Sequence, residues 1–353
     1  MWIETLKIQN FRNIASATVD VPNGGAFAIV GANGAGKTSL LEALSLLTPG
    51  RGLHRAKLDE ITRYNEKSWG VFARIRTHTE PENTLGMQYA AKKRQIKLNG
   101  SVLTSAAPMA AMGSVVWFTP EMDRLFFDGP APRRRFFDRL VFGLTPKHAE
   151  NLTRYTHHIQ SRARLLKDEG DADWIALEET QAATYGLAVM HARAAYLDAL
   201  KPYLKDVDLT LAGTAEKDLT TLTEAAFAQA MADNRKRDKR FNSTHYGPHR
   251  TDVTGELIGL TALGAASMGQ HKRALMQLLI AHSALIKDCT GASPCLLMDE
   301  ATAHLDKTNR QALFGQLIEL GSQLWLTGTD EDMFKTLPNV HFLSADKGSF
   351  TWR

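Results

Sequence analysis

The stretch Gly31-Ala32-Asn33-Gly34-Ala35-Gly36-Lys37-Thr38 decides the fold, because it matches the pattern G-x-x-x-x-G-K-[ST] at every fixed position. A short apolar run, residues 26–30, comes directly before it, and leucines at helical spacing follow from Leu40 to Leu47. This order of strand, glycine-rich turn and helix predicts a phosphate-binding loop. The alternative, a glycine-rich turn with a chance lysine, does not account for the strand before it or the helix after it.

The chemistry of phosphate binding uses each part of this loop. Glycines let backbone N–H groups turn inward around a phosphate without Cβ clashes, and the helix N-terminus adds its positive end. Lys37 supplies a point charge to the β and γ oxygens, and the Thr38 hydroxyl is suited to Mg²⁺. We therefore predict ATP and Mg²⁺ as cofactors. The predicted nucleotide-binding residues of the loop are Gly31, Ala32, Asn33, Gly34, Ala35, Gly36, Lys37, Thr38 and Ser39.

A second acidic motif follows the apolar run 295–298, where Asp299 and Glu300 stand together. Asp299 is predicted to hold Mg²⁺, and Glu300 is predicted to act as the general base that polarises the attacking water. Together with Lys37 these are the predicted catalytic residues. The alternative is a core strand that ends in two solvated acids. The next residues, Ala301-Thr302-Ala303-His304-Leu305-Asp306, resemble the D-loop of ABC-type ATPases and favour the functional interpretation.

The motif Ser267-Met268-Gly269-Gln270 opens a segment with helical leucine spacing. It resembles the signature of ABC-type ATPases, in the form S-x-G-Q found in the SMC-like branch. Alone it could be an ordinary Ser/Gly helix start, but it lies between the other two motifs. In that class the signature of one subunit caps the γ-phosphate held by the other subunit. The resemblance therefore implies nucleotide contacts by Ser267, Gly269 and Gln270, and an ATP-dependent homodimer with two-fold symmetry.

The composition is that of an ordinary globular chain of 353 residues, with 44% hydrophobic and 23% charged residues, and the length suggests two domains. The net charge of +4 permits a nucleic-acid partner without proving one. The two cysteines, Cys289 and Cys295, are expected to be buried thiols in a reducing compartment. No secretion signal and no apolar run long enough to cross a membrane occurs in the sequence, so we expect a cytosolic protein without a membrane partner.

The order of patterns along the chain predicts an α/β fold with an inserted helical lobe. Period-two alternation in the first thirty residues and from 69 to 102 predicts strands, with a tight turn at Asn99-Gly100. From 133 to 240 the spacing is mostly helical. Strands at 251–258, 295–298 and 323–327 then alternate with helices at 269–286 and 307–320. We predict an ATPase lobe of residues 1–124 plus 245–353, with a mixed sheet and an antiparallel β subdomain, and a helical lobe of residues 125–244.

Further motifs separate the branches of the superfamily. Compared with transporter ATPases, far more residues separate Lys37 from Ser267, and Ala301 stands in place of the usual proline. SMC proteins carry long heptad segments, which this insert lacks. The chain instead resembles the RecF family along its whole length. The motifs that carry this resemblance are Leu6-x-Ile8-x-Asn10-Phe11-Arg12-Asn13, the loop 31–39, Phe118-Thr119-Pro120-Glu121, Gly129-Pro130, Arg133-Arg134, Phe136-Phe137-Asp138, and Tyr246-Gly247-Pro248-His249-Arg250 followed by Asp252.

This resemblance implies a nucleoid-associated mediator of gap repair. It would dimerise with ATP on double-stranded DNA near single-strand junctions in gapped DNA, help RecO and RecR to load RecA, and be released by slow hydrolysis. Thr327-Gly328-Thr329 stands where transporters keep a switch histidine, and His271 stands where another polar amide is expected. The alternatives are a soluble ABC ATPase subunit that energises a non-DNA partner, and a structural protein with an inactive nucleotide site. The intact Lys37 and Glu300 disfavour the latter.

Four basic clusters are candidates for DNA contact, and the densest runs from Arg235 to Arg240. We predict backbone contacts with little sequence readout, because no aromatic residues are interleaved with the charges. A solvated charged face, or for the densest cluster a flexible linker, is the alternative for each. The other clusters are Lys92-Lys93-Arg94, Arg133-Arg134-Arg135 and Arg162 with Arg164. The predicted DNA-binding residues are Arg235, Lys236, Arg237, Lys239 and Arg240.

Overall fold

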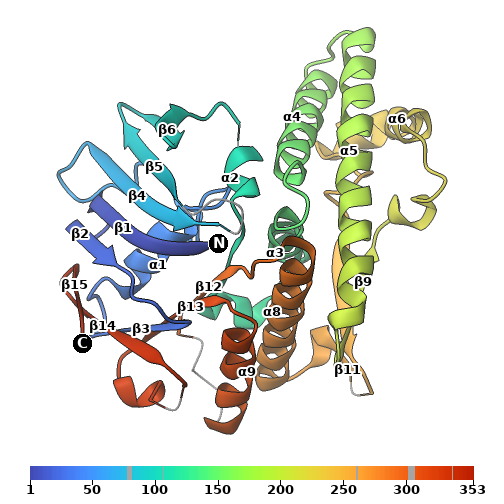
Figure 1. Ribbon diagram of the computed structural model, residues 1–353. Helices are drawn as coiled ribbons and strands as arrows, with labels where there is room; N and C mark the ends of the chain where they lie inside the picture. The colour runs from blue at the N-terminus through green and yellow to red at the C-terminus, as the bar shows by residue number, and fades with distance from the viewer. Residues whose placement is uncertain (78–81, 106, 260, 301–306, 336) are drawn as a thin grey trace. The chain divides into compact units, whose positions relative to one another are not determined.

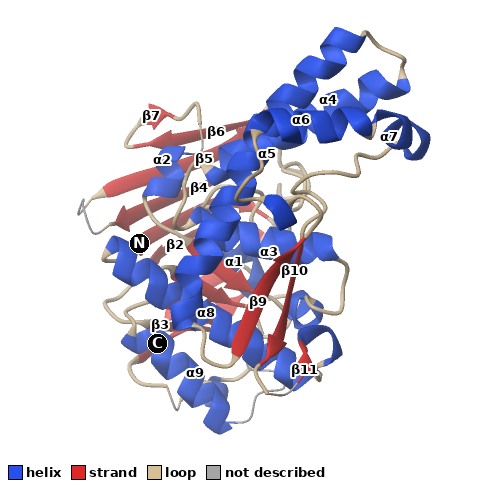
Figure 2. Cartoon of the chain, turned by 90° about the vertical axis from the view of Figure 1, so that its right-hand side faces the viewer, coloured by secondary structure: helices blue, strands red, loops and turns tan. Residues whose placement is uncertain are grey.

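The computed structural model describes residues 1–77, 82–105, 107–259, 261–300, 307–335 and 337–353 (Figure 1; Figure 2 shows secondary structure after a quarter turn). It divides into two compact units. Unit 1 combines Met1–Asp123 with Leu275–Arg353, and unit 2 is Arg124–Ala274. Both chain termini therefore belong to unit 1. The α/β fold predicted from the sequence, with its inserted and mostly helical second part, is confirmed.

Unit 1 contains an antiparallel sheet with the strand order β2-β1-β4-β5-β6-β7. Apolar residues alternate with polar ones along its long strands, so that one face is buried and the other faces solvent. Asn99 and Gly100 both have positive φ at the tight turn between β6 and β7, as predicted. The strands are β1 (Trp2–Phe11), β2 (Ile14–Asp20), β4 (Ser68–Arg76), β5 (Asn83–Ala90), β6 (Lys93–Leu98) and β7 (Ser101–Val102).

The second sheet of unit 1 has the order β15-β14-β3-β13-β12-β8. All neighbouring pairs are parallel except β14 with β15. Four of its strands are buried along their whole length, as expected for parallel strands covered on both faces. The strands are β3 (Ala26–Val30), β8 (Val115–Phe118), β12 (Cys295–Met298), β13 (Gln323–Gly328), β14 (Val340–Asp346) and β15 (Ser349–Trp352).

Side chains join the two sheets of unit 1 into one core. The Gln323 amide at the start of β13 accepts from the Ile3 N–H at 3.0 Å and donates to the Ile3 carbonyl at 2.8 Å. Buried leucines of the first helix and of the two residues after it, from Leu40 to Leu47, pack in the same cluster as Trp69 and Trp325. The helical segments are α1 (Lys37–Ser45), α2 (Ala107–Ala111), α9 (Lys307–Glu319), the 3-10 turns η1 (Pro120–Arg124) and η5 (Glu331–Met333), and α8 (Met268–Thr290), which crosses the division between the units.

Unit 2 is built on a hairpin of two long helices, α4 (His148–Lys167) and α5 (Ala172–Leu200), which lie side by side in Figure 1. The Asp171 carboxylate caps α5 by accepting from the N–H groups of Asp173 and Trp174. The other helical segments are α3 (Pro130–Phe142), α6 (Glu224–Asp233), α7 (Arg235–Phe241), η2 (Lys201–Tyr203), η3 (Glu216–Asp218) and η4 (Leu263–Ala265). A three-stranded antiparallel sheet, β11-β10-β9, consists of β9 (Val207–Ala212), β10 (Asp252–Leu257) and β11 (Thr261–Ala262), and Figure 2 shows β9 beside β10.

The lobes predicted from the sequence and the two units of the structure differ in where the second part of the chain ends. The sequence places the end of the helical lobe at residue 244, whereas unit 2 continues to Ala274. The reason is that β10 pairs along its whole length with β9, a strand inside the helical region. The strands and helices predicted between 251 and 327 are confirmed to within a few residues at each end.

Two further expectations concern cysteine burial and membrane spans. Cys295 is buried as predicted, but the prediction for Cys289 was wrong, because this residue is exposed near the end of α8. Among the helices of the described residues, none is both long enough and apolar enough to cross a membrane.

Candidate nucleotide site and nucleic-acid interface

The predicted phosphate loop joins the buried strand β3 to helix α1. Gly36 has a φ of 106°, in the left-handed region, and α1 begins at the next residue, Lys37. Gly31 approaches β14 so closely that an added Cβ would lie 2.2 Å from the Ala345 carbonyl oxygen. Glycine is therefore required at both ends of the turn for steric reasons, independent of any ligand.

The side chain of Lys37 lies across this loop. Its Nζ donates to the carbonyl oxygens of Gly31 at 2.7 Å and Ala32 at 2.9 Å, and the residue is 8% exposed. Asn13, from the turn between β1 and β2, donates to the Gly34 carbonyl at 2.9 Å and accepts from the Ser39 hydroxyl at 2.8 Å. Asn13 thus fixes the far side of the loop, a role that the sequence motif did not indicate.

Asp299 lies at the carboxyl end of β12, beside the start of α1. The Thr38 Oγ1 is 3.2 Å from both carboxylate oxygens of Asp299, which is 5% exposed. The Asp299 N–H donates to the Phe118 carbonyl on β8 at 2.9 Å, so the parallel strands hold this residue at their common edge. Two predicted motifs that are far apart in the sequence are therefore in contact.

Thr327, at the end of β13, connects Asp299 with Glu300. Its hydroxyl donates to Asp299 Oδ1 at 2.7 Å and accepts from the Glu300 N–H at 2.9 Å. Glu300 is exposed and has a φ of 47°, an uncommon conformation for a residue other than glycine that clusters at functional sites. From the sequence, Thr327 was of interest only because a histidine is absent at this position. A hydroxyl directly after the apolar run 324–326 of β13 was the available signal.

The residues at this edge fit a magnesium ion. Thr38 and Asp299 offer one hydroxyl and one carboxylate, all oxygen ligands, within 3.2 Å of each other. Mg²⁺ is commonly bound by one or two carboxylates together with substrate phosphates and water. The D-loop predicted at Ala301–Asp306 lies outside the described residues.

The predicted signature residues open α8 as a capping box. The Ser267 N–H donates to Gln270 Oε1 at 2.8 Å, and the Gln270 N–H reaches Ser267 Oγ at 3.4 Å. A Cβ added at Gly269 would meet nothing within 4 Å, so this position borders open space. Ser267 is exposed. These residues belong to unit 2, whereas the phosphate loop belongs to unit 1.

His271 packs directly behind the signature residues. It is fully buried, its ring stacks on Phe127 with centroids 4.0 Å apart, and its Nε2 is hydrogen-bonded to the Leu263 carbonyl. The imidazole therefore ties the start of α8 to the preceding turn. This position, which the sequence left without a role, supports the conformation of the signature loop.

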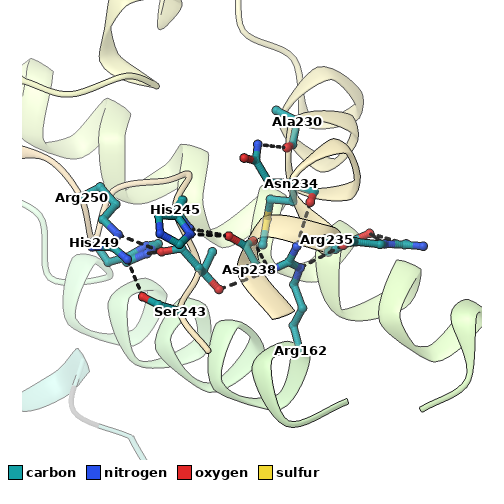
Figure 3. A network of polar contacts seen from close by, with 12 residues as sticks. Arg162, Ala230, Asn234, Arg235, Asp238, Ser243, His245, His249 and Arg250 are labelled. Carbon is teal, nitrogen blue, oxygen red and sulfur yellow. Dashed lines mark hydrogen bonds and ion pairs between the residues drawn. The ribbon is translucent and has the colours of Figure 1, made fainter. Parts of the chain in front are cut away.

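The densest basic cluster forms helix α7 rather than a linker, and its cations differ in their surroundings. Arg235 donates to Glu179, with Nε 3.0 Å from Oε1, and Lys239 pairs with Glu169 at 2.6 Å. Arg162 of α4 donates to the same Glu179 carboxylate, at 2.9 Å, and both arginines are labelled in Figure 3. Lys236, Arg237 and Arg240 are exposed, and no ion pair of theirs occurs within the described residues.

Arg162 was a candidate for DNA contact, and the structure contradicts that prediction. The residue is fully buried, and it donates to Glu179 at 2.9 Å, to Asp238 at 2.8 Å and to the Met231 carbonyl at 2.8 Å. His245 is also hydrogen-bonded to Asp238, as Figure 3 shows. A buried guanidinium with these partners serves the packing of α4, α5, α6 and α7.

The first part of the Gly-Pro-His-Arg motif also packs inside unit 2, with Gly247 and Pro248 buried, whereas Arg250 is exposed. His249 Nε2 donates to the Thr244 carbonyl at 2.8 Å, so its Nδ1 accepts from the Tyr155 hydroxyl at 2.6 Å. Burial lowers the pKa of His249 to about 4, which keeps the ring neutral. Arg193 joins the motif to α3 by donating to the Pro248 carbonyl and, through two nitrogens, to Asp138.

Two arginines of the basic cluster in α3, Arg133 and Arg134, also make structural contacts. Arg133 forms a two-pronged ion pair with Asp252, at 2.8 and 2.9 Å, and Arg134 donates to the Thr251 carbonyl at 2.6 Å. The acid that follows the Gly-Pro-His-Arg motif therefore has its partner on α3. These contacts join the two motifs within unit 2.

Comparison with known proteins agrees with this fold and site. The family model described as "RecF/RecN/SMC N terminal domain" matches residues 2–349. Among solved structures, RecF with ATP superimposes with a TM-score of 0.87 at 24% identity, covering 100% of this chain and 97% of that chain. An Smc head domain from Pyrococcus furiosus superimposes with a TM-score of 0.56 at 16% identity, covering 100% and 96%. The fold is thus that of the RecF and SMC heads.

Curated relatives narrow the assignment within this class. The "DNA replication and repair protein RecF" of Mesorhizobium japonicum is 36% identical, covering 98% of this chain and 97% of its own length. The protein of the same name from Brucella suis biovar 1 is 36% identical, covering 99% and 96%. The chain belongs to the RecF family.

Proposed function

We propose that this protein is an ATP-gated DNA-binding protein of recombinational gap repair. The observation that carries the proposal is the contact of Thr38, Asp299, Thr327 and Glu300 at one edge of a parallel sheet, beside Lys37 and the loop. Membership of the RecF family supplies the nucleic-acid context. A solved RecF structure that contains ATP has the same fold.

ATP binding uses groups that are already oriented. The backbone N–H groups of residues 31–38 and the N-terminus of α1 surround the β-phosphate, and Lys37 exchanges its loop carbonyl partners for the β and γ oxygens. Mg²⁺, held by Thr38 and Asp299, would neutralise charge on the β and γ oxygens. Thr327 keeps the Asp299 carboxylate turned toward Thr38.

Hydrolysis places one proton on Glu300. Water attacks the γ-phosphorus, the bond from this phosphorus to the β–γ bridging oxygen breaks, and ADP leaves while Glu300 accepts the proton of the water. The hydrogen bond between the Glu300 N–H and Thr327 fixes the backbone from which the base projects. Hydrolysis is slow in this proposal and acts as a switch that releases the DNA.

Dimerisation is the step that ATP controls. The exposed Ser267 hydroxyl and the N–H groups at the start of α8, beside Gly269, bind the γ-phosphate held by a second copy. The capping box leaves the Ser267 hydroxyl accepting one long bond of 3.4 Å, so its hydrogen is available to a phosphate. Two ATP molecules then join two copies in a two-fold dimer.

The dimer binds double-stranded DNA near single-strand junctions, and the exposed cations of α7 contribute backbone contacts. RecO, RecR and RecA are proposed partners, in line with the family resemblance. The cytoplasmic, nucleoid-associated location stays a prediction. A second candidate, a soluble ABC subunit that energises a non-DNA partner, is disfavoured by the relatives named for DNA replication and repair.

The test measures binding of the purified protein to gapped duplex DNA without nucleotide, with ADP and with ATP, together with its mass in solution. We expect tight binding and dimers only with ATP, and neither with Lys37→Met. DNA binding that is independent of nucleotide would contradict the gating. ATP-dependent dimers without DNA binding would favour the second candidate.

A further inference from the structure

A groove lined by both polar and apolar groups crosses the solvent-exposed face of the antiparallel sheet of unit 1. Its volume is about 530 Å³, in the range of pockets that hold a small organic ligand. Residues from β1, β2, β4, β5 and β6 line it. The nucleotide loop, the acidic edge of the parallel sheet and the cations of α7 contribute no residue to this lining.

The strand register explains how the groove forms. Lys7, Phe72, Gly86 and Lys97 stand opposite one another on β1, β4, β5 and β6, so they make one row across the sheet. The next row on the same face contains Gln9, Gly70, Gln88 and Gln95. Because Gly70 and Gly86 lack side chains, the centre is hollow, with Lys7 and Lys97 on either side of Phe72 and Gly86 in one row and amides in the other.

An aromatic ring lies at the centre of this hollow. Phe72 is 37% exposed, and its ring lies 3.9 Å from the Cβ that an alanine would place at residue 86. The ring therefore rests over Gly86, and this contact between β4 and β5 stabilises the sheet. The remaining exposed fraction offers an aromatic surface to a ligand.

The charges around the ring have one sign. Two lysines, Lys7 and Lys97, line the groove, and no aspartate or glutamate does so among the described residues. Neither lysine has an ion pair with any described residue, in contrast to Arg74 and Arg76 at the edge of the same face, which both lie near Glu4. A polyanion is the partner that this arrangement favours.

The position on the face of the sheet excludes a peptide added as a further strand. The backbone N–H and C=O groups of β1, β4 and β5 are paired with neighbouring strands on both sides. Only side chains are available, namely ammonium, amide and hydroxyl groups and one ring. Lysine and glutamine bind phosphates and sugars, and an exposed ring stacks on a base.

We propose that this groove binds single-stranded nucleic acid, with phosphates at Lys7 and Lys97 and a base on Phe72. The bases of a duplex are covered by their neighbours, so only an unpaired base can stack on the ring. Three strand spacings separate Lys7 from Lys97, roughly 14 Å, so a segment of several nucleotides spans them. The inference rests on the proposed function, because the groove holds the single-stranded side of the junction whose duplex side the dimer binds.

The experiment uses the full-length protein and a labelled thymidine oligonucleotide of about 16 nucleotides, followed by fluorescence anisotropy across a salt series. The groove variants are Phe72→Leu, Gly70→Leu and the double variant Lys7→Gln/Lys97→Gln. An added Cβ at Gly70 meets only the Met87 carbonyl oxygen, at 3.9 Å, so leucine fills the groove without backbone strain. The matched control is Lys67→Gln, since Lys67 is an exposed lysine just before β4 that does not line the groove and belongs to none of the candidate basic clusters.

We expect Phe72→Leu and Gly70→Leu to weaken binding of the single strand about tenfold, and Phe72→Tyr to retain it. The double lysine variant should lower the slope of log affinity against log salt by about 0.7 for each lysine. Lys67→Gln should bind like the wild type. Circular dichroism melting of each variant establishes that the fold is retained, and Phe72→Tyr keeps the test valid if Phe72→Leu unfolds.

Parallel measurements on duplex DNA with ATP separate this inference from the proposed function. Loss of single-strand binding in the groove variants, with ATP-dependent duplex binding retained, supports the inference. If the wild type binds duplex but not the single strand, the inference fails and the proposed function stands. If single-strand binding depends on the groove but the duplex does not bind, the proposed function fails instead. Equal weakening by Lys67→Gln would overturn a specific site. So would equal displacement of the oligonucleotide by polyglutamate together with no effect of Phe72→Leu.

Discussion

Replacing Thr327 by valine tests the two hydrogen bonds of the Thr327 hydroxyl, which join the Asp299 carboxylate to the Glu300 N–H. The residue is 1% exposed, and valine has nearly the same shape, so the change removes the hydroxyl without opening a cavity. Two hydrogen bonds disappear, one to the Asp299 carboxylate at 2.7 Å and one from the Glu300 N–H at 2.9 Å. Bonds to charged groups contribute about 1.5–3 kcal/mol, and neutral ones about 1 kcal/mol. We expect the free energy of unfolding to fall by about 2–3 kcal/mol.

The effect on catalysis should exceed the effect on nucleotide affinity. Lys37 and the loop glycines have no hydrogen bond to the Thr327 side chain among the described residues, so the Kd for ATP should change less than about threefold, equivalent to 0.7 kcal/mol. Glu300 loses its backbone anchor. If the loss of this anchor raises the activation free energy of hydrolysis by about 1.4 kcal/mol, kcat falls about tenfold.

The assay compares steady-state ATP hydrolysis with equilibrium binding of a fluorescent ATP analogue. Thr327→Ser keeps the hydroxyl and should retain most activity. Thr329→Val is the matched control, because Thr329 is exposed two residues further along. A Thr327→Val protein with wild-type kcat would refute the argument, and so would equal losses in Thr327→Val and Thr329→Val.

Three further outcomes follow from other contacts. Gln270→Ala removes the capping box and should destabilise the start of α8 by about 1 kcal/mol and weaken ATP-dependent dimers in sedimentation, whereas Gln270→Glu should preserve them. The pKa of His249 in the folded protein is about 4, below its ordinary value of 6.5, so the unfolded chain binds the proton first as the pH falls. The free energy of unfolding should therefore fall as the pH drops from 6.5 toward 4, by about 2 kcal/mol at pH 5 when measured by urea unfolding. His249→Gln should lose less stability over the same range. Arg237→Glu should weaken duplex binding and lower its salt slope with the melting temperature unchanged, whereas Arg235→Glu should lower the melting temperature.

Local patterns accounted for much of the fold and of the nucleotide site. The loop at 31–38 and the acids Asp299 and Glu300 were recognisable because their neighbours in sequence define the strand and helix around them. The strands and helices after residue 250 were predicted for the same reason. In contrast, β9 was missed, although Val207, Leu209 and Leu211 alternate with polar neighbours, because its partner β10 lies some forty residues further along.

The contacts that the sequence did not reveal are long-range ones between polar groups. Thr327 has a role only because β13 lies beside β12, which brings its hydroxyl to Asp299. Arg162 was grouped with surface cations, yet its partners come from α5 and α7. A charged residue carries no local mark of burial, since the cost of burying it is offset by partners elsewhere in the chain.

Once residues 235–241 are known to form a helix, helical periodicity separates the charged residues of α7 that form ion pairs with described residues from those that do not. At about 100° per residue, Asp238, Arg235 and Lys239 fall within one arc of roughly 100°, while Lys236, Arg240 and Arg237 fall within the opposite arc. The first three form the ion pairs with Arg162, Glu179 and Glu169, and the second three are exposed. Charge that is already neutralised adds little to phosphate binding, because few counterions are released when it meets DNA. We therefore expect the DNA surface of α7 to be its outer arc, and Arg235, which pairs with the buried Glu179, belongs to the scaffold that presents it. Lys239 is itself exposed, and its ion pair with the exposed Glu169 is a weak surface pair, so its predicted DNA contact stays a prediction.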